Sequence, residues 1–538
     1  MMDFAGNITG AFVAFAVICL AIVVFSYALV KYFEDRHEGE PLVTATCVVG
    51  LSTCLATIFL IPVDVYITAG TTDLSTGLKH PWATPDFLSY VQLGLKIAYY
   101  VLYSCVVFGS FVVIPWVYFY FEEGGGEDST FKRRALSATK YTAATMITVS
   151  VLFVAALLLK TRNDDSPRDI EWLEKLLGSG VETPFIALIG VLITLGLLVY
   201  VSFTSLGLSL LPIRFIQAGS ANQINQDAVA QLAIVQERLR AFRAKCGREG
   251  PGAMNRREKG ELEELERKER DLQTRVLAME RANSNFWVRF WNGLKPFMIF
   301  IGTVVLLLSL SITFAILLAC IDKIKNSFCG ASCGWMLDHP MFYNPVNWLL
   351  LRASKYFPLD TLLLLVIIMY LFFCTLVALT RLGIRCLCIP LYTIRHNATS
   401  PQGLLLGTML MMLVTVAYGY VVLVLAPQWG TFGVQRYCDL PSRNCTDDPS
   451  KIRPCTMQAP TSLCTPTTIS TIINRTTYTF PLFGTIFYWA QWAFLAVFVV
   501  GMVGAIAQPD DRHGEVSDDE EEDMERQALL ARATAARR

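Results

Sequence analysis

The sequence predicts an all-α polytopic membrane protein with nine transmembrane helices and a cytosolic helical hairpin between spans five and six. Of the 538 residues, 54% are hydrophobic and only 17% are charged, against roughly a quarter charged in an ordinary soluble domain. The hydrophobic residues gather in discrete stretches long enough for a helix to cross a bilayer, which takes about 20 residues. This composition excludes a soluble enzyme, a disordered protein and a small disulfide-rich domain.

Nine stretches are expected to span the membrane, at about 10–32, 43–66, 91–121, 141–160, 185–211, 297–321, 358–380, 403–427 and 481–507. Helices are the expected form because a lipid-exposed backbone must satisfy its own polar groups. The alternating pattern of a membrane β-barrel does not occur. We expect the first stretch to be retained, because its flank holds Asp3 and no basic residue, unlike a signal peptide.

One large polar segment, 213–295, separates the first five spans from the last four. Apolar residues recur there at intervals of three and four on both sides of a glycine-rich break at 247–252, which predicts two helices in an antiparallel hairpin. The hairpin either packs only on itself or docks a partner, such as a second copy of the chain in a homodimer. The predicted parts are therefore membrane helices in 1–212, the hairpin in 213–295, membrane helices in 296–507 and an acidic tail in 508–538.

The basic residues predict the orientation. With the N-terminus in the lumen, 30 of the 45 lysines and arginines fall in cytosolic segments, 14 fall in lumenal loops and Lys96 falls inside a span. Basic residues favour the cytosolic side, so this orientation is preferred, with the tail cytosolic. Three glycosylation sequons, at Asn7, Asn444 and Asn474, then lie on the lumenal side, whereas the sequon at Asn397 is cytosolic and should stay unmodified.

Six cysteines also fall in predicted lumenal loops, the second of which spans 428–480: Cys329, Cys333, Cys438, Cys445, Cys455 and Cys464. In an oxidising compartment they predict up to three disulfides, and six cysteines allow 15 pairings. The alternative is a metal site, because the spacing of the first two loosely resembles a zinc pair and His339 lies in the same loop. We favour disulfides and expect no metal.

Three charged residues lie within or beside the predicted spans: Asp64, Lys96 and Asp360. A charge in the membrane is costly unless it is paired or hydrated, so each is a candidate residue of a transport pathway. All three lie near a predicted lumenal end, however, where a charge can also cap or anchor a helix. Both interpretations stay open.

No catalytic residues are predicted, because the chain has no phosphate-binding glycine loop, no HExxH and no GxSxG. The protein is therefore not expected to be an enzyme, and an ATPase would have to be a separate partner. Basic and acidic residues balance at 45 each, and the expected surroundings are the lipid bilayer, with no nucleic acid. In the tail, Glu525, Leu529 and Leu530 match the acidic dileucine pattern that clathrin adaptors read, or else form a small amphipathic patch.

Short blocks distributed in order along residues 10–430 resemble the lysosomal cobalamin transporter family, which belongs to the limb region 1-like membrane proteins. They include Ile61-Pro62-Val63-Asp64-Val65, Phe357-Pro358-Leu359-Asp360, Leu391-Tyr392-Thr393-Ile394-Arg395 and the blocks 115–123, 140–142, 211–213, 286–287, 294–296, 367–370, 400–402 and 426–428. The match is weakest in the loop at 438–464 and in the tail.

The resemblance implies nine helices, a glycosylated lumenal N-terminus, a cytosolic tail and a place in the lysosomal or vacuolar membrane. It implies export of cobalamin to the cytosol, performed directly or in support of an ABC transporter, with cobalamin as transported ligand rather than cofactor. The alternative function is a membrane receptor or trafficking adaptor of the lipocalin-receptor-like type, which would use the hairpin and the tail to recruit cytosolic proteins.

Overall fold

The computed structural model describes residues 4–35, 39–73, 76–122, 131–161, 182–217, 232, 234–240, 286–326, 344–354, 356, 358–386, 389–439, 445, 451–456, 459–460 and 463–507. Most of the predicted hairpin, the acidic tail with its sorting motif, Asn444, Cys329 and Cys333 lie outside these residues. The predictions for them stay predictions.

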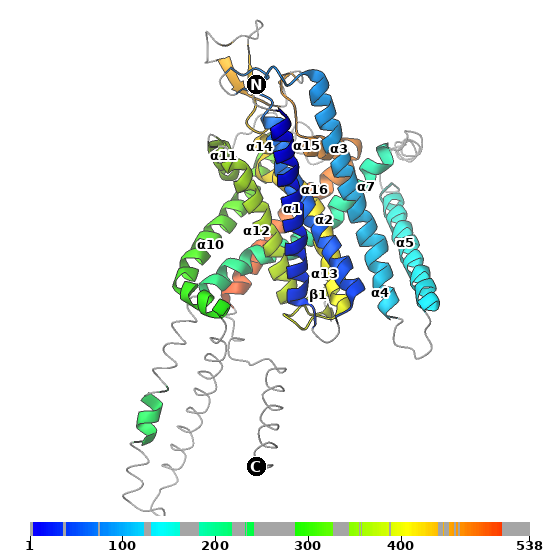
Figure 1. Cartoon of the computed structure of the whole chain (residues 1–538), viewed down its shortest axis with the longest axis vertical. Helices are drawn as coiled ribbons and strands as arrows, with labels where there is room; N and C mark the ends of the chain where they lie inside the picture. The colour runs from blue at the N-terminus through cyan, green and yellow to red at the C-terminus, as the bar shows by residue number, and fades with distance from the viewer. Residues whose placement is uncertain are drawn as a thin grey trace, which may run out of the picture. The chain divides into compact units, whose positions relative to one another are not determined.

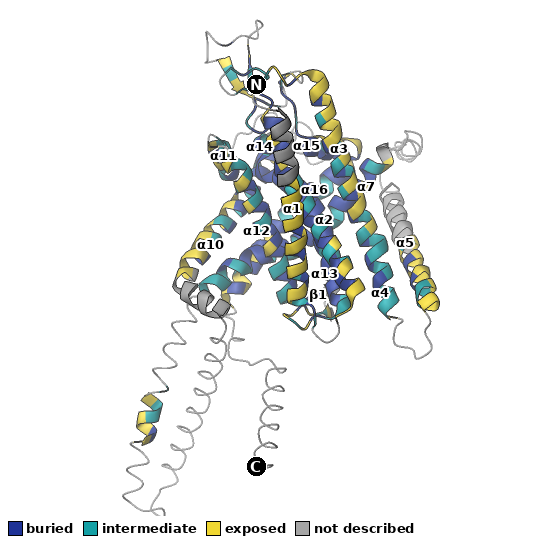
Figure 2. Cartoon of the chain, viewed as in Figure 1, coloured by how far each residue is buried: buried dark blue, intermediate teal, exposed yellow. Residues whose placement is uncertain are grey.

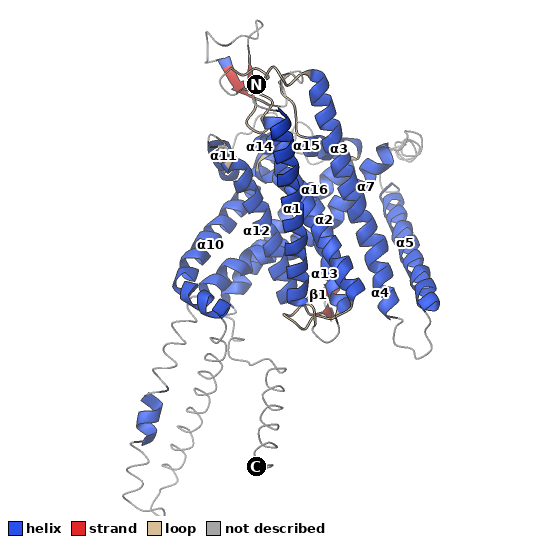
Figure 3. Ribbon diagram, in the orientation of Figure 1, coloured by secondary structure: helices blue, strands red, loops and turns tan. Residues whose placement is uncertain are grey.

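The described residues are almost entirely helical (Figures 1 and 3). The long helices are α1 (Phe4–Phe33), α2 (Pro41–Ala69), α3 (Pro85–Phe108), α5 (Phe131–Thr161), α7 (Glu182–Val199), α10 (Phe286–Asn326), α12 (Leu359–Leu382), α13 (Pro401–Leu425) and α16 (Pro481–Ala507). The π-helical segment η1 (Gly109–Val113) joins α3 to α4 (Ile114–Glu122), and η3 (Tyr200–Thr204) extends α7. Shorter helices are α11 (Pro345–Ala353), α14 (Pro427–Phe432) and α15 (Thr468–Thr479).

Two small antiparallel ladders complete the described part. Strand β1 (Ile384–Cys386) pairs with β2 (Ile389–Tyr392), and β3 (Arg436–Cys438) pairs with β4 (Ile452–Pro454) in the register Tyr437 opposite Arg453. Both ladders lie in loops between helices, so the membrane class predicted from composition is unaffected.

Eight helices of the described part are long and apolar enough to cross a membrane, over Phe15–Phe33, Pro41–Ala69, Pro85–Glu122, Pro184–Gln217, Ile299–Lys325, Leu359–Leu382, Pro401–Leu425 and Pro481–Ala507. The polytopic all-α class is therefore confirmed. The ninth predicted span, 141–160, falls within α5, whose side chains beyond Ile147 are not described. A count of nine stays a prediction.

The chain divides into two compact units, Met1–Leu208 with Leu310–Val499, and Ser209–Ser309 with Val500–Arg538. In the second unit, the first half of α10 packs closely on residue Ile216, because a Cβ on Gly302 would lie 2.7 Å from its Cγ1. The residues of the candidate site described below all belong to the first unit.

Helix α13 is the core of the first unit. Its residues from Met411 to Leu425 are all buried. Burial on every side is expected for a helix that is apolar almost all the way round. Two glycines bring helices of the core together: a Cβ on Gly196 of α7 would collide with the Leu413 carbonyl oxygen, and one on Gly207 with the Cys374 carbonyl oxygen. Exposed residues instead run along α1 and α3 on the outside (Figure 2).

Loops that were predicted to share a side of the membrane lie together. The amides of Asn397 and Thr399 donate to the carbonyls of Tyr32 and Phe33, joining two predicted cytosolic loops. At the other end, Gly77 lies against the backbone of Cys438, so two predicted lumenal loops meet. In Figure 1, α14 and α15 lie at the end of the bundle where α1 begins, and β1 at the end where it finishes.

Candidate functional site

The carboxylate of Asp64, near the end of α2, is completely buried. A buried carboxylate is tolerated only where hydrogen bonds replace its water. One oxygen accepts from the Thr468 amide at 3.2 Å and the other from the Ile469 amide at 2.9 Å. These amides open α15, where backbone N–H groups have no partner within the helix. Asp64 therefore caps a helix that begins about 400 residues later in the chain.

Further polar side chains enclose this carboxylate. The hydroxyl of Thr68, one turn later on α2, donates to the Asp64 carbonyl at 2.7 Å and approaches its carboxylate at 3.4 Å. The buried tyrosines Tyr99 and Tyr103 of α3 lie close enough to interact with the carboxylate electrostatically. The carboxyl group is thus surrounded by hydrogen-bonding groups from two membrane helices and the start of α15.

Helix α15 packs deeply against the membrane helices. Its residues Ile469, Ser470, Ile473, Thr476 and Thr477 are each at most 2% exposed. It contacts α2, α3, α7 and α13, and the Ile469 side chain reaches α13, where a Cβ on Gly419 would lie 3.0 Å from it. A short helix with its own N-cap, the Thr467 hydroxyl, therefore covers one end of the core helix.

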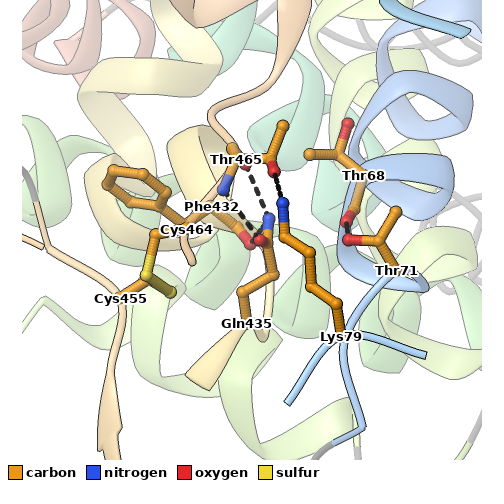
Figure 4. Close-up of a disulfide and its surroundings, with 8 residues drawn as sticks. All are labelled: Thr68, Thr71, Lys79, Phe432, Gln435, Cys455, Cys464 and Thr465. Carbon is orange, nitrogen blue, oxygen red and sulfur yellow. Dashed lines mark hydrogen bonds between the residues drawn. A yellow bond between two sulfur atoms is a disulfide. The ribbon is translucent and has the colours of Figure 1, made fainter. Parts of the chain in front are cut away.

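The segment before α15 is held by the side-chain amide of Gln435 (Figure 4). Its nitrogen donates to the carbonyls of Phe432 and Thr465, at 2.9 and 2.7 Å, and its oxygen accepts from the Thr465 amide at 3.0 Å. The Thr467 hydroxyl donates to the Gly430 carbonyl at 2.8 Å. These bonds fix the chain leading into α15 against α14.

Four of the six predicted lumenal cysteines lie in this region and form disulfides, Cys438 with Cys445 and Cys455 with Cys464. Cys455 and Cys464 pack with Phe432 (Figure 4) and with Ala459 in a small apolar cluster. Within the described residues, no group of three or more His, Cys, Asp or Glu side chains could hold a metal.

Lys79 attaches the loop between α2 and α3 to the same segment. Its ammonium donates to the Thr465 hydroxyl at 2.8 Å, and partial burial lowers the pKa of Lys79 below its ordinary value. Loops 70–84 and 433–467 are therefore joined beside the start of α15.

A second group of buried polar side chains lies within the bundle. The Thr375 hydroxyl of α12 makes hydrogen bonds to the Thr204 hydroxyl of η3 at 2.7 Å and to the Tyr418 hydroxyl of α13 at 2.8 Å. All three are fully buried. Hydrogen bonds of this kind link helices inside a membrane bundle.

The structure places the three predicted pathway residues in different settings. Asp64 is fully enclosed, whereas Lys96 and Asp360 are partly exposed. The Lys96 ammonium lies over the Tyr100 ring at 5.5 Å, and Asp360 occupies the first turn of α12, a position that favours an acid. The contacts of Asp64 with the first amides of α15 are those of a residue that caps a helix.

The predicted glycosylation sites also differ in setting. Asn7 lies in α1, with its side chain outside the described part. Asn474 lies within α15, is partly buried, and its amide donates to the Ser470 hydroxyl at 3.1 Å. The sequon at Asn397 lies in a tight turn, where Asn397 has φ +54° and Thr399 is completely buried.

Sequence reasoning missed the partners of Asp64, because backbone amides leave no trace in side-chain chemistry. One available signal was the succession Thr467-Thr468-Ile469-Ser470, which has the hydroxyl residues that precede and open a helix. It also missed Gln491, a polar residue inside the apolar run of the last span.

Comparison with known proteins gives the family. Residues 11–285 match the family model described as LMBR1-like membrane protein. Proteins named probable lysosomal cobalamin transporter are similar over 96% of this chain: 34% identical in Aspergillus oryzae, covering 93% of that protein, 32% in Emericella nidulans and 34% in Aspergillus niger, each covering 94%. No solved structure matches the chain. The chain therefore belongs to the LMBR1-like membrane proteins, within the family of the probable lysosomal cobalamin transporters.

Proposed function

We propose that this protein exports cobalamin from the lysosomal or vacuolar lumen to the cytosol, or supports an ABC transporter that does so. The observation that carries the proposal is similarity over almost the whole chain to proteins named probable lysosomal cobalamin transporter. Cobalamin is the transported ligand in this proposal, and the chain has no catalytic role.

The arrangement of α13 and α15 is compatible with a path that opens by helix movement. A corrinoid is far too large for a narrow ion-type pore, so helices would have to separate to let it pass. Helix α15 would have to move away from the end of α13 that it covers. The hydrogen bonds that the Thr468 and Ile469 amides donate to Asp64 would then have to break. Asp64 then controls the path by holding α15, without contacting the cargo.

The proposed orientation has a lumenal N-terminus and a cytosolic tail. The excess of basic residues in the predicted cytosolic segments supports it. So do the two disulfides, since disulfides persist in oxidising compartments. The end of the bundle that carries α15 would then face the lumen.

The decisive experiment is flux of labelled cobalamin in vesicles that contain this purified protein alone. Saturable flux, absent from empty vesicles, is expected if the protein forms the path. Flux that appears only after an ABC transporter is added would leave the supporting role, and no flux in either case would contradict the proposal.

The cytosolic parts give a second test. Deleting 213–295 should preserve flux if the membrane helices form the path, provided the protein still reaches its membrane. Complete loss of cobalamin release from correctly placed protein would instead favour a receptor or adaptor function for the hairpin. Replacing Leu529 and Leu530 with alanine should mislocalise the protein if clathrin adaptors read the tail.

A further inference from the structure

Two polar side chains deep in the bundle lack the hydrogen-bond partners that burial demands. Gln491 of α16 is completely buried, and within the described part of the chain neither its amide oxygen nor its amide nitrogen has a partner. The Tyr200 hydroxyl of η3 is equally buried and, among the described residues, also lacks one. Buried polar groups in native proteins are nearly always paired, so each exception calls for a reason.

These two side chains belong to helix faces that meet. The Tyr200 ring stacks on Phe494 with the ring centroids 4.4 Å apart, and the Phe487 ring lies 5.0 Å from Tyr420 of α13. Gln491 lies on α16 between Phe487 and Phe494, four residues after one and three before the other. Such spacing places all three on one face. The amide therefore lies on the face of α16 that packs on η3 and α13.

The helices around these two side chains carry further polar groups. Tyr418 and Tyr420 of α13 and Cys320 of α10 lie in the neighbourhood of the Tyr200 hydroxyl, so both helices bring polar side chains to this region. The backbone of η3 is a π-helical turn, a local widening that occurs frequently at functional sites. The flanking positions on α16 are phenylalanines, so an apolar residue at 491 would suit packing alone.

The two side chains named above, the Gln491 carboxamide and the Tyr200 phenol, are neutral. A carboxamide both donates and accepts, and a phenol can do the same. Such groups match a ligand that also offers neutral donors and acceptors, of which primary amides are the closest complement. A corrinoid carries carboxamide side chains around its ring.

We propose that Gln491 and Tyr200 form an intramembrane binding site for carboxamide groups of the transported ligand, lying between α16, η3 and α13, and that water occupies it when the ligand is absent. The identity of the ligand rests on the function proposed above, whereas the existence of a hydrated polar site is independent of that function.

Access of water to position 491 tests the site directly. In the otherwise complete chain, Gln491→Cys is treated in vesicles with a small hydrophilic thiol reagent, and modification is read at that position by mass spectrometry. The matched control is Val499→Cys, two turns later on α16, where the side chain is 58% exposed on the outside of the bundle. Lipid should shield this control from the reagent.

We expect modification at position 491, little at position 499, and at least a severalfold reduction at 491 in excess cobalamin. No modification at 491 in monodisperse protein would overturn the site. Modification that cobalamin leaves unchanged would overturn the assignment to the transported ligand. If wild-type protein moves no cobalamin either alone or with an added ABC transporter, the proposed function fails, while labelling at 491 still reports whether the site is hydrated.

Two further variants separate binding from packing. Tyr200→Phe keeps the ring that stacks on Phe494 and removes only the hydroxyl, and Gln491→Leu keeps the bulk and removes the amide. Each is expected to raise the KM for cobalamin flux by about fivefold to tenfold, as the loss of one or two neutral hydrogen bonds would. An unchanged KM in both variants would contradict the proposal.

Discussion

Asp64 illustrates how a membrane carboxylate can be structural. Each carboxylate oxygen of Asp64 accepts a hydrogen bond from one backbone amide, that of Thr468 or that of Ile469. In Asp64→Asn, one of these oxygens is replaced by an NH₂ group, which donates and cannot accept, so one backbone amide loses its partner. The cost of an unsatisfied buried donor is about 1–3 kcal/mol. We predict a lower thermal unfolding midpoint for Asp64→Asn in detergent solution.

The control for this change is Asp360→Asn, a partly exposed acid in the first turn of α12. At Asp360 the loss of folding stability should be only about 0.3–1 kcal/mol, the usual size of a helix-dipole interaction. Equal losses at the two positions would contradict the capping role of Asp64.

Gly207 is a residue where backbone approaches backbone. Its added Cβ would overlap the Cys374 carbonyl oxygen of α12, and neither partner is a side chain that could rotate away. We predict that Gly207→Ala lowers stability by about 1–3 kcal/mol, as overpacking does. Gly94→Ala, where no atom lies within 4 Å of the added Cβ, should instead be neutral or stabilising by up to about 1 kcal/mol. Thermal unfolding of both variants, with the wild type, distinguishes these outcomes.

Lys79 should make stability depend on pH. Burial lowers its pKa in the folded protein below the ordinary value of 10.5, so the unfolded chain binds the proton more tightly. Stability therefore rises as pH increases from the folded pKa toward 10.5, and it is lowest, for this group, where both states are protonated. We predict that Lys79→Met reduces the alkaline rise in unfolding midpoint. An identical pH profile in the variant would show that Lys79 contributes nothing to it.

Among the elements, apolar length was sufficient to predict eight spans, because crossing the hydrocarbon core depends on local hydropathy alone. Helix α15 was not predicted, since it is short, rich in β-branched threonine and isoleucine, and capped in part by Asp64. Its formation depends on contacts with α2, α3, α7 and α13. In the same way, Asp64 could be singled out from its residue type, but its role required knowing which helix end it faces.

The loop before α15 gives a sharp test of pairing. Its four described cysteines could be joined in three ways, and the structure joins Cys438 to Cys445 and Cys455 to Cys464. We predict that peptide mapping by mass spectrometry without reduction finds these two links. Crossed links would mean that the segment leading into α15 is arranged differently.

For the whole molecule, the prediction concerns topology. Glycans should be found at one or more of Asn7, Asn444 and Asn474 and none at Asn397, which lies with the loops predicted to face the cytosol. The turn at Asn397 and the buried Thr399 would resist modification after folding as well. Glycosidase treatment of single-sequon variants measures this. A glycan at Asn397 would reverse the proposed orientation.

The distance in sequence between Asp64 and its partners has a consequence for biosynthesis. Asp64 precedes Thr468 by 404 residues, which at typical rates of synthesis corresponds to roughly 20–80 seconds on the ribosome. Throughout that interval α2 carries an acid whose two amide donors have not yet been made. Chains that stop before α15 should therefore be retained by quality control and degraded, even though most of their transmembrane helices are complete.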